Sequence, residues 1–366
     1  MIFTCTQENL LAGLSSVVPV AGRNSQLPIL QYILLQGKDN VLHLTSTDLE
    51  IGVHTIVGGK IEGDGVCAVP ARRLLDYVQQ LPKTNPIVLK LEEQHIIVST
   101  KGFSAKFPLS DAEDFPLLPT IHEDTVIPLD GTVFCNALTS VLFAASREDA
   151  RPEIRSVFVK IDKGELRVAA TDSFRLAEKN ITIASSEIWQ SILPLASVQE
   201  IVRLFSDEKS IHILPHDSHI SFRSDTVEFS SRLVDANYPD YQQIIPTTSE
   251  TVLKVDKNDF LRALKTVSVF LPRDSKRVKL QFLPDKEILK VSVLGVEVGE
   301  GEVEVRALGD GDEFTVMLNI QYVMDGAAHI SSKACVLCFG TEADPVVIKP
   351  DSERAHYVYV VMPIQV

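Results

Sequence analysis

The chain has 366 residues, 45% of them hydrophobic and 23% charged, which suffices for two or three soluble domains that each bury a core. No stretch approaches about 18 uninterrupted apolar residues, and the first residues lack the basic and apolar regions of a signal peptide. We therefore expect a cytoplasmic protein without membrane-spanning helices. The formal net charge of −14, from 35 basic and 49 acidic residues, argues against a surface that binds nucleic acid tightly throughout.

The first third of the chain alternates twice between helical and strand patterns. Leu10, Leu14 and Val17, at spacing i, i+4, i+7, predict an amphipathic helix over 7–18. Pro70 predicts the start of a second helix over 70–80, because proline lacks the N–H that the first turn of a helix leaves unbonded. Strands are expected near 30–36, 41–46, 51–57, 87–91, 95–99 and 103–109.

The apolar triplet of the first helix recurs twice along the chain. Its copies, the first of them 124 residues later, are Phe134, Leu138 and Val141, then Phe260, Leu264 and Val267. Three triplets in one register indicate an internal repeat more strongly than chance apolar spacing does. Further helices are expected from Leu193-Pro194 to about Phe205, over 256–270 and over 319–329, with late strands at 288–293 and 335–339.

Two polar signatures repeat as well. Thr47-Asp48 recurs as Thr171-Asp172, and Asp111-Ala112 recurs as Asp235-Ala236, each Asp-Ala pair being followed closely by an aromatic residue and proline. The prolines favour extended linkers at 111–125 and 235–249. The repeat predicts three similar α+β domains, each with two helices packed on antiparallel sheets. Their expected bounds are 1–121, 122–247 and 248–366.

Several strings give the whole chain a family resemblance. They are Leu27-Pro28-Ile29-Leu30, Thr47-Asp48-Leu49-Glu50, Val69-Pro70-Ala71-Arg72, Ala170-Thr171-Asp172, Tyr238-Pro239-Asp240-Tyr241 and Tyr359-Val360-Val361-Met362-Pro363. With these strings the chain resembles the bacterial β sliding clamps, the processivity subunits of DNA polymerase III. The resemblance implies a head-to-tail homodimer whose six domains form a ring around duplex DNA, located in the cytoplasm at the nucleoid. It implies neither a catalytic site nor a cofactor.

A sliding ring needs weak contact with DNA, because strong phosphate contacts would oppose movement. Although the net charge is acidic, the segment 256–279 carries seven basic residues against three acidic ones. The candidate DNA-facing residues lie on or beside expected helices, and each could instead be an ordinary solvated charge. They are Arg23, Arg72, Arg73, Arg147, Arg151, Arg203, Arg262 and Lys265.

The resemblance also implies a cleft that binds short linear peptides of the replicative polymerase, the clamp loader and repair proteins. Its residues would be Ile154, Thr171, Phe174, Arg175, Leu176, Pro239, Gln243, Ile244, Val360, Met362, Pro363 and Ile364. Such a set is mainly apolar, with Thr171 and Arg175 for orientation and an adaptable methionine. The alternative is that these are core and linker residues, and Asp172 in particular is expected to be structural. Because Phe174 and Gln243 replace the histidine and arginine of some clamps, we expect a less basic cleft.

The dimer contact implied by the resemblance would join Phe107 and Leu109 of the first domain to Val269 and Phe270 of the third domain of the other chain. Core packing is the rival explanation for these four residues.

Two other classes of function compete with this interpretation. His212, His216 and His219 could hold a metal ion for an enzyme, although Pro215 to Ser218 is expected to be a turn between strands. A scaffold with the same three repeats, but not encircling DNA, is the other alternative. Cys335-x-x-Cys338 has no second ligand pair and is expected to lie in a buried strand rather than in a zinc site.

Overall fold

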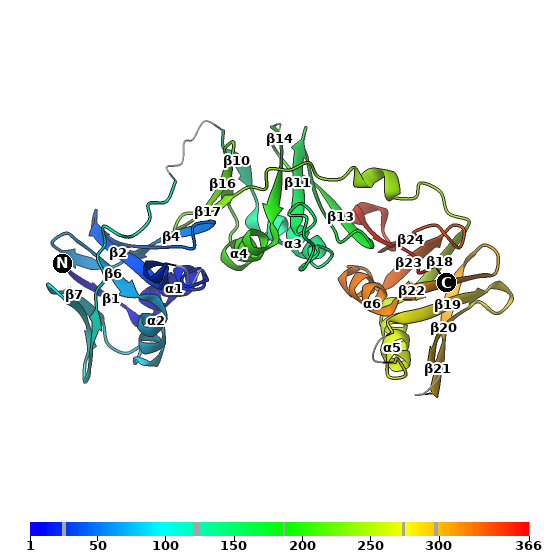
Figure 1. Cartoon of the computed structure of the whole chain (residues 1–366), viewed down its shortest axis with the longest axis horizontal. Coiled ribbons are helices and arrows are strands. Elements are labelled where there is room, and N and C mark those ends of the chain that lie inside the picture. The colour runs from blue at the N-terminus through cyan, green and yellow to red at the C-terminus, as the bar shows by residue number, and fades with distance from the viewer. Residues whose placement is uncertain (24–26, 120–124, 186, 273–274, 296–298, 366) are drawn as a thin grey trace. The chain divides into compact units, whose positions relative to one another are not determined.

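The computed structural model describes residues 1–366 except 24–26, 120–124, 186, 273–274, 296–298 and 366 (Figure 1). Its described residues divide between two compact units. Unit 1 consists of Met1–Cys135 and Gln199–Leu233, and unit 2 consists of Asn136–Val198 and Val234–Val366. Each unit is described by itself below.

The described residues form six α-helices, two in each third of the chain, as the repeat predicts. They are α1 (Gln7–Val17), α2 (Ala71–Gln80), α3 (Gly131–Leu142), α4 (Leu195–Phe205), α5 (Lys257–Ser268) and α6 (Ile320–His329). Side chains cap several of them: Thr6 accepts from the Asn9 N–H at the start of α1, and Asp256 accepts from two N–H groups at the start of α5. Local sequence therefore sets where these helices begin.

Unit 1 contains two antiparallel sheets. The five-stranded sheet has the order β5-β1-β7-β8-β9, and the eight-stranded sheet has the order β10-β15-β16-β17-β4-β3-β2-β6. Their strands are β1 (Ile2–Cys5), β2 (Tyr32–Lys38), β3 (Val41–Thr47), β4 (Ile51–Gly58), β5 (Lys60–Glu62), β6 (Gly65–Pro70), β7 (Ile87–Leu91), β8 (His95–Thr100), β9 (Phe103–Pro108), β10 (Ile127–Leu129), β15 (Ile211–Pro215), β16 (His219–Arg223) and β17 (Val227–Arg232). β17 pairs with β4, so the sheet is continuous across the expected domain boundary.

Unit 2 contains one twelve-stranded sheet with the order β14-β11-β12-β13-β25-β24-β23-β18-β21-β20-β19-β22. Its strands are β11 (Ser156–Asp162), β12 (Glu165–Thr171), β13 (Arg175–Thr182), β14 (Ile188–Pro194), β18 (Thr251–Asp256), β19 (Arg277–Leu283), β20 (Ile288–Gly295), β21 (Gly299–Asp310), β22 (Phe314–Asn319), β23 (Ala334–Phe339), β24 (Val346–Pro350) and β25 (Tyr357–Val361). The pairing of β13 with β25 joins the middle of the chain to its end, in the way that β4 and β17 are joined in unit 1.

The repeated apolar triplets are the core stripes of three helices. All nine side chains are buried, the most exposed being Phe134 at 1%. Burying a large aliphatic or aromatic side chain stabilises a fold by about 1.5–3 kcal/mol, so each stripe fixes which face of its helix meets the sheet. The predicted fold class, α+β with paired helices on antiparallel sheets, is confirmed.

The two Thr-Asp signatures form the same turn. In the first, Thr47 Oγ1 donates to the Ile51 carbonyl, and Asp48 Oδ1 accepts from the Glu50 and Ile51 N–H groups at 3.0 and 2.7 Å. In the second, Thr171 Oγ1 donates to the Arg175 carbonyl, and Asp172 Oδ1 accepts from the Phe174 and Arg175 N–H groups, both at 3.0 Å. The turn also places Leu49 and Ser173 in the left-handed region, with φ of 79° and 76°. Asp172 thus has a structural role, as expected, because its carboxylate closes the turn.

The segment expected to be an extended linker at 235–249 is instead partly helical and packed on the sheet. Residues Tyr241–Ile244 form a 3₁₀ turn, η2, and the Tyr241 ring is buried in an apolar cluster with Leu176 and Val360. Its hydroxyl donates to Glu178 Oε2 at 2.7 Å. The prediction failed because the prolines restrict φ without excluding a tight turn, and burial of the ring favours one.

Other local expectations also needed correction. The strand expected from residue 30 begins at Tyr32, because Pro28–Gln31 form a 3₁₀ turn, η1. Two further 3₁₀ turns are η3 (Pro284–Lys286) and η4 (Glu353–Ala355). The short strands β1 and β5 and the strand β6 were not predicted, because their pairing partners lie far along the chain. In the part of the chain that the structure describes, no helix is long and apolar enough to cross a membrane.

Candidate functional site

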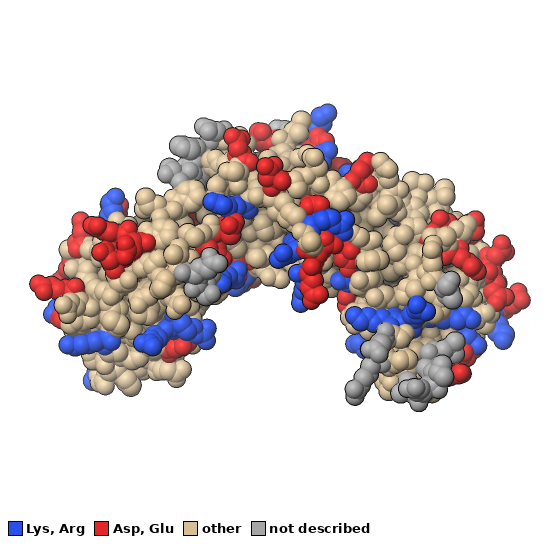
Figure 2. Space-filling model, in the orientation of Figure 1, with Lys and Arg blue, Asp and Glu red and all other residues tan. Residues whose placement is uncertain are grey.

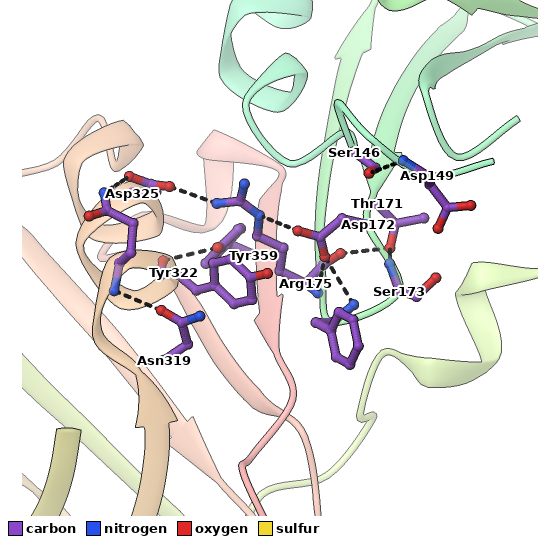
Figure 3. Close-up of polar contacts among 12 residues, drawn as sticks. Ser146, Asp149, Thr171, Asp172, Ser173, Arg175, Asn319, Tyr322, Asp325 and Tyr359 are labelled. Carbon is purple, nitrogen blue, oxygen red and sulfur yellow. Dashed lines mark hydrogen bonds and ion pairs between the residues drawn. The ribbon is translucent and has the colours of Figure 1, made fainter. Parts of the chain in front are cut away.

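The candidate partner site lies in unit 2, where β13 meets β25 (Figure 3). The register pairs Arg175 with Val361 and Leu176 with Val360, and the Met362 N–H donates to the Phe174 carbonyl at 2.9 Å. Beyond this bond, the Ile364 N–H donates to the Met317 carbonyl of β22 at 2.8 Å. Strand pairing thus brings the turn after β12 and the C-terminal tail together.

The twelve residues predicted for this site differ in exposure. Phe174 and Ile244 are 63% and 42% exposed, Pro239 and Gln243 are also exposed, and residues 362–364 are half-buried. By contrast, Ile154, Thr171, Leu176 and Val360 are at most 4% exposed. The exposed apolar members are available to a ligand, whereas the buried four are not, and two of these, Leu176 and Val360, belong to one apolar core cluster. The Gln243 amide donates to Asp240 at 2.7 Å.

Arg175 is the most constrained residue of the site. Its Nε donates to Asp172 Oδ2 at 2.9 Å and its Nη1 donates to Asp325 Oδ2 at 2.6 Å (Figure 3). The guanidinium also lies over the Tyr322 ring, 4.4 Å from its centre. Burial alone would lower the pKa of Arg175, but Tyr359 and the two carboxylates raise it overall, so the group stays charged.

Sequence reasoning missed the residues of α6 that complete this cluster. Tyr322 and Asp325 lie on α6, and Phe143, which follows α3, has its ring 5.7 Å from the Arg175 guanidinium. Asp325 is 150 residues from Arg175 in the sequence, so no local spacing could reveal the pair. The one available signal was that an arginine beside buried apolar residues needs a carboxylate partner.

Two of the candidate DNA-facing arginines are held by one buried carboxylate in unit 1. Glu200, 4% exposed, pairs with both Arg23 and Arg203. Arg203 also donates to the carbonyls of Ser15 and Ser16 at 2.9 and 2.7 Å, which satisfies the C-terminal end of α1. Arg203 thereby ties α4 to the end of α1, and the single Glu200 carboxylate offsets one of the two positive charges.

The other candidate cations are exposed on or beside helices. Arg72 and Arg73 lie on α2, and Arg262 and Lys265 lie on α5 beside a surface hollow of about 410 Å³. Arg147 and Arg151 follow α3, and Arg151 is paired with Asp149 through two bonds of 2.9–3.0 Å. In Figure 2, Lys and Arg gather on the surface of unit 2 around α5 and β19. Arg72 and Arg262 also contact carboxylates on their own helices, Asp76 at 3.0 Å and Asp259 at 3.5 Å. The four cations on α2 and α5 are exposed and so can meet an anion.

Three family models together match almost the entire chain. They describe the N-terminal domain (residues 1–119), the central domain (residues 128–240) and the C-terminal domain (residues 242–365) of the DNA polymerase III beta subunit. The chain belongs to the β sliding clamp family. It is 27% identical over 360 residues to the beta sliding clamp of Chlamydia pneumoniae, covering 98% of this chain and 96% of that protein.

Solved structures of sliding clamps agree with the fold. The DNA polymerase III subunit beta of Pseudomonas aeruginosa superposes with a TM-score of 0.94 at 26% identity, covering both chains completely. A clamp of the same organism bound to griselimycin has a TM-score of 0.95 at 26% identity, again over both whole chains. The chain is thus a sliding clamp with three similar domains, and sliding clamps are processivity factors without a catalytic site of their own.

The residues predicted for the clamp dimer contact differ in accessibility. Phe107, on the edge strand β9, is only 7% exposed, and its ring packs edge to face on Tyr77 at 5.7 Å. Leu109 is half-buried, and Val269 at the end of α5 is 77% exposed. Phe270 is half-buried, with its ring against Gly301. Val269 is the residue that most needs a partner, and the contact stays a prediction.

The alternative of a metal-dependent enzyme is not supported. His212 lies on β15 opposite Arg223, whereas His219 lies on β16 opposite Arg232, with His216 in the turn between these strands. Among the described residues no three His, Cys, Asp or Glu side chains converge as metal ligands. Cys335 and Cys338 both lie in β23 and are buried, as the sequence predicts, and burial raises the pKa of the Cys335 thiol to about 12.

Proposed function

We propose that two copies of this clamp assemble head to tail into a ring that encircles duplex DNA in the cytoplasm. Each copy would contribute three domains, over 1–121, 122–247 and 248–366. The observation that carries the proposal is the repeated domain with two helices, matched from end to end by the beta subunit models. A head-to-tail interface whose rotation closes generates a ring rather than a fibre.

The DNA contact would be weak and independent of sequence. The exposed cations on α2 and α5 support this proposal, because all four are solvated. The ion pairs of Arg72 and Arg262 are exposed and therefore weak, so a phosphate can compete with the carboxylates. The pairing of Arg23 and Arg203 with Glu200 makes these two residues weaker candidates. A net charge of −14 fits a clamp held by topology rather than by affinity.

The partner site would bind short peptides of the replicative polymerase, the clamp loader and repair proteins. Exposed Phe174, Pro239 and Ile244 beside the half-buried tail support an apolar peptide-binding surface. The griselimycin complex of a related clamp is a further reason to expect a ligand site in this family. The dimer contact would join Phe107 and Leu109 to Val269 and Phe270 of the partner.

Retention on DNA of two topologies tests the ring. We expect a particle of about twice the chain mass of 40.4 kDa that, once loaded, remains on nicked circular DNA and leaves the linearised form. Equal retention on both forms would refute encirclement. For the cations, Arg262→Gln with Lys265→Gln should lower the magnitude of the slope of log binding constant against log salt on a short duplex by about 2 for each copy in the ring. The control, Lys101→Gln with Lys163→Gln, removes equal charge from exposed hairpin turns.

A labelled partner peptide tests the second site. Phe174→Ala should weaken its binding about tenfold without affecting folding, because the side chain is 63% exposed. Ile188→Ala is the matched control, since Ile188 is 69% exposed at the edge strand β14 of the same unit. If both variants bind the peptide like the unaltered clamp, the site lies elsewhere.

A further inference from the structure

The Arg175 guanidinium has two carboxylate partners and two flanking rings, although the preceding residue in the chain is a highly exposed member of the partner site. Its side chain is 12% exposed, while the neighbouring Phe174 is 63% exposed. Its Nε and Nη1 donate to Asp172 and Asp325, and the Tyr359 hydroxyl interacts with it as well. The rings of Phe143 and Tyr322 flank the guanidinium. A peptide carboxylate could bind this arginine only by displacing one of these partners.

The internal repeat shows that the arginine is not needed to build the turn. Ile51 stands in the first copy where Arg175 stands in the second, and the Asp48 turn has the same hydrogen bonds as the Asp172 turn. Asp172 uses Oδ1 for the turn and Oδ2 for the arginine, so the two tasks are separable. Arg175 and Asp325 are therefore an addition specific to the copy that carries the partner site.

The charge of this addition is negative. One guanidinium with two carboxylates leaves one net negative charge beside the surface that a peptide would cover. Asp325 remains 29% exposed, so its charge acts at the surface. Asp240, next to Pro239 in the chain, adds a further carboxylate to the partner site and accepts from Gln243, whereas the charge of Asp149 is offset by its ion pair with Arg151.

We propose that Asp325 is a specificity-determining residue of the partner site: by occupying Arg175, it makes the site disfavour peptides that carry a carboxylate there and favour uncharged ones. This inference rests on the proposed partner function and names the chemistry of the peptide. Asp325 acts through Arg175, so it is a positioning residue rather than a direct ligand. Removing its charge loosens the hold on Nη1 of Arg175 and changes the net charge of the cluster from −1 to zero.

The test uses the full-length clamp and matched peptides. We would screen labelled nine-residue peptides by fluorescence anisotropy. The peptides carry leucine and phenylalanine anchors, with Gln at the spacer positions. Each peptide that binds is then remade with Glu in place of Gln, one spacer position at a time. We expect each Glu peptide to bind the unaltered clamp no better than its Gln twin. With Asp325→Asn, at least one position should gain about fivefold in the ratio of Glu to Gln affinity.

Three controls make the outcome decisive. Asp325→Glu keeps the charge and should keep the original preference, and Arg175→Gln combined with Asp325→Asn should lose the gain. Asp240→Asn removes an equal charge from the same site without freeing a guanidinium; an equal gain in this variant would overturn the assignment to Asp325 in favour of long-range charge. A ratio unchanged by Asp325→Asn would overturn the proposal too.

Folding and binding failures are distinguished separately. If Asp325→Asn does not fold, Asp172→Asn frees Nε of Arg175 while its Oδ1 still accepts the turn hydrogen bonds, and the same gain is expected. Absence of a gain in that variant would count against the proposal. If no peptide binds the unaltered clamp, the partner site itself is refuted, which is a different outcome from unchanged preference.

Discussion

The duplicated Thr-Asp turn allows the Arg175 ion pair to be measured against an internal reference. Asp48→Ala removes two backbone hydrogen bonds to a carboxylate in a partly exposed turn, which should lower the free energy of unfolding of unit 1 by about 1–2 kcal/mol. Asp172→Ala removes the same two bonds and also the 2.9 Å contact with Arg175, whose side chain is only 12% exposed.

The additional cost of Asp172→Ala should be about 1–3 kcal/mol. Breaking a fully buried ion pair costs about 3–5 kcal/mol, but Asp325 remains as a partner for the guanidinium and reduces the loss. Asp172→Asn should show only this additional cost, because its Oδ1 can still accept both N–H groups. The difference in unfolding free energy between Asp172→Ala and Asp48→Ala therefore measures the ion pair without the turn hydrogen bonds.

The single tryptophan makes the measurement specific to one unit. Trp189 lies on β14 in unit 2, so its fluorescence during urea unfolding follows the unit that contains Asp172. The two units need not unfold in one two-state transition, so unit 1 needs a probe of its own. Hydrogen exchange of the backbone N–H groups in β3 and β4 provides it. Equal costs for the two alanine variants, or an Asp172→Asn cost equal to that of Asp172→Ala, would refute this reasoning.

Three further outcomes follow from buried groups. Tyr241→Phe should lower the Trp189 unfolding free energy by about 1–3 kcal/mol, because it removes the donor at 2.7 Å from the buried Glu178 carboxylate; no change would mean that water replaces the hydroxyl. Gly326→Ala should destabilise unit 2, because the new Cβ would lie 2.1 Å from the buried Tyr359 ring. This clash should outweigh the gain in helix propensity of about 1 kcal/mol. A rise in the urea midpoint would contradict the prediction. All five cysteines are buried, and burial raises the pKa of the Cys5 thiol to about 12, so the native clamp should not react with a thiol reagent at pH 8 until urea unfolds it.

The sequence by itself determined the repeat and the six helices, and the recurring Thr-Asp pair indicated a local structural role. Apolar residues at i, i+4, i+7 place a stripe on one helix face, and a Thr-Asp pair can close a turn with bonds to residues two to four positions away. These are local interactions, so they can be recognised in a linear string. The family strings then supplied the partner-site residues around Phe174 and the tail as expectations.

The tertiary structure decided which charges are free and which are used. Glu200 binds Arg23 across 177 residues, and Asp325 binds Arg175 across 150 residues, so neither pair has a signature in local spacing. Likewise, Phe107 is buried against Tyr77 although its strand is an edge strand. The residue type alone does not tell whether a charged or apolar side chain faces solvent or contacts another part of the fold. Only the long-range packing of strands and helices distinguishes an exposed side chain from a paired or buried one.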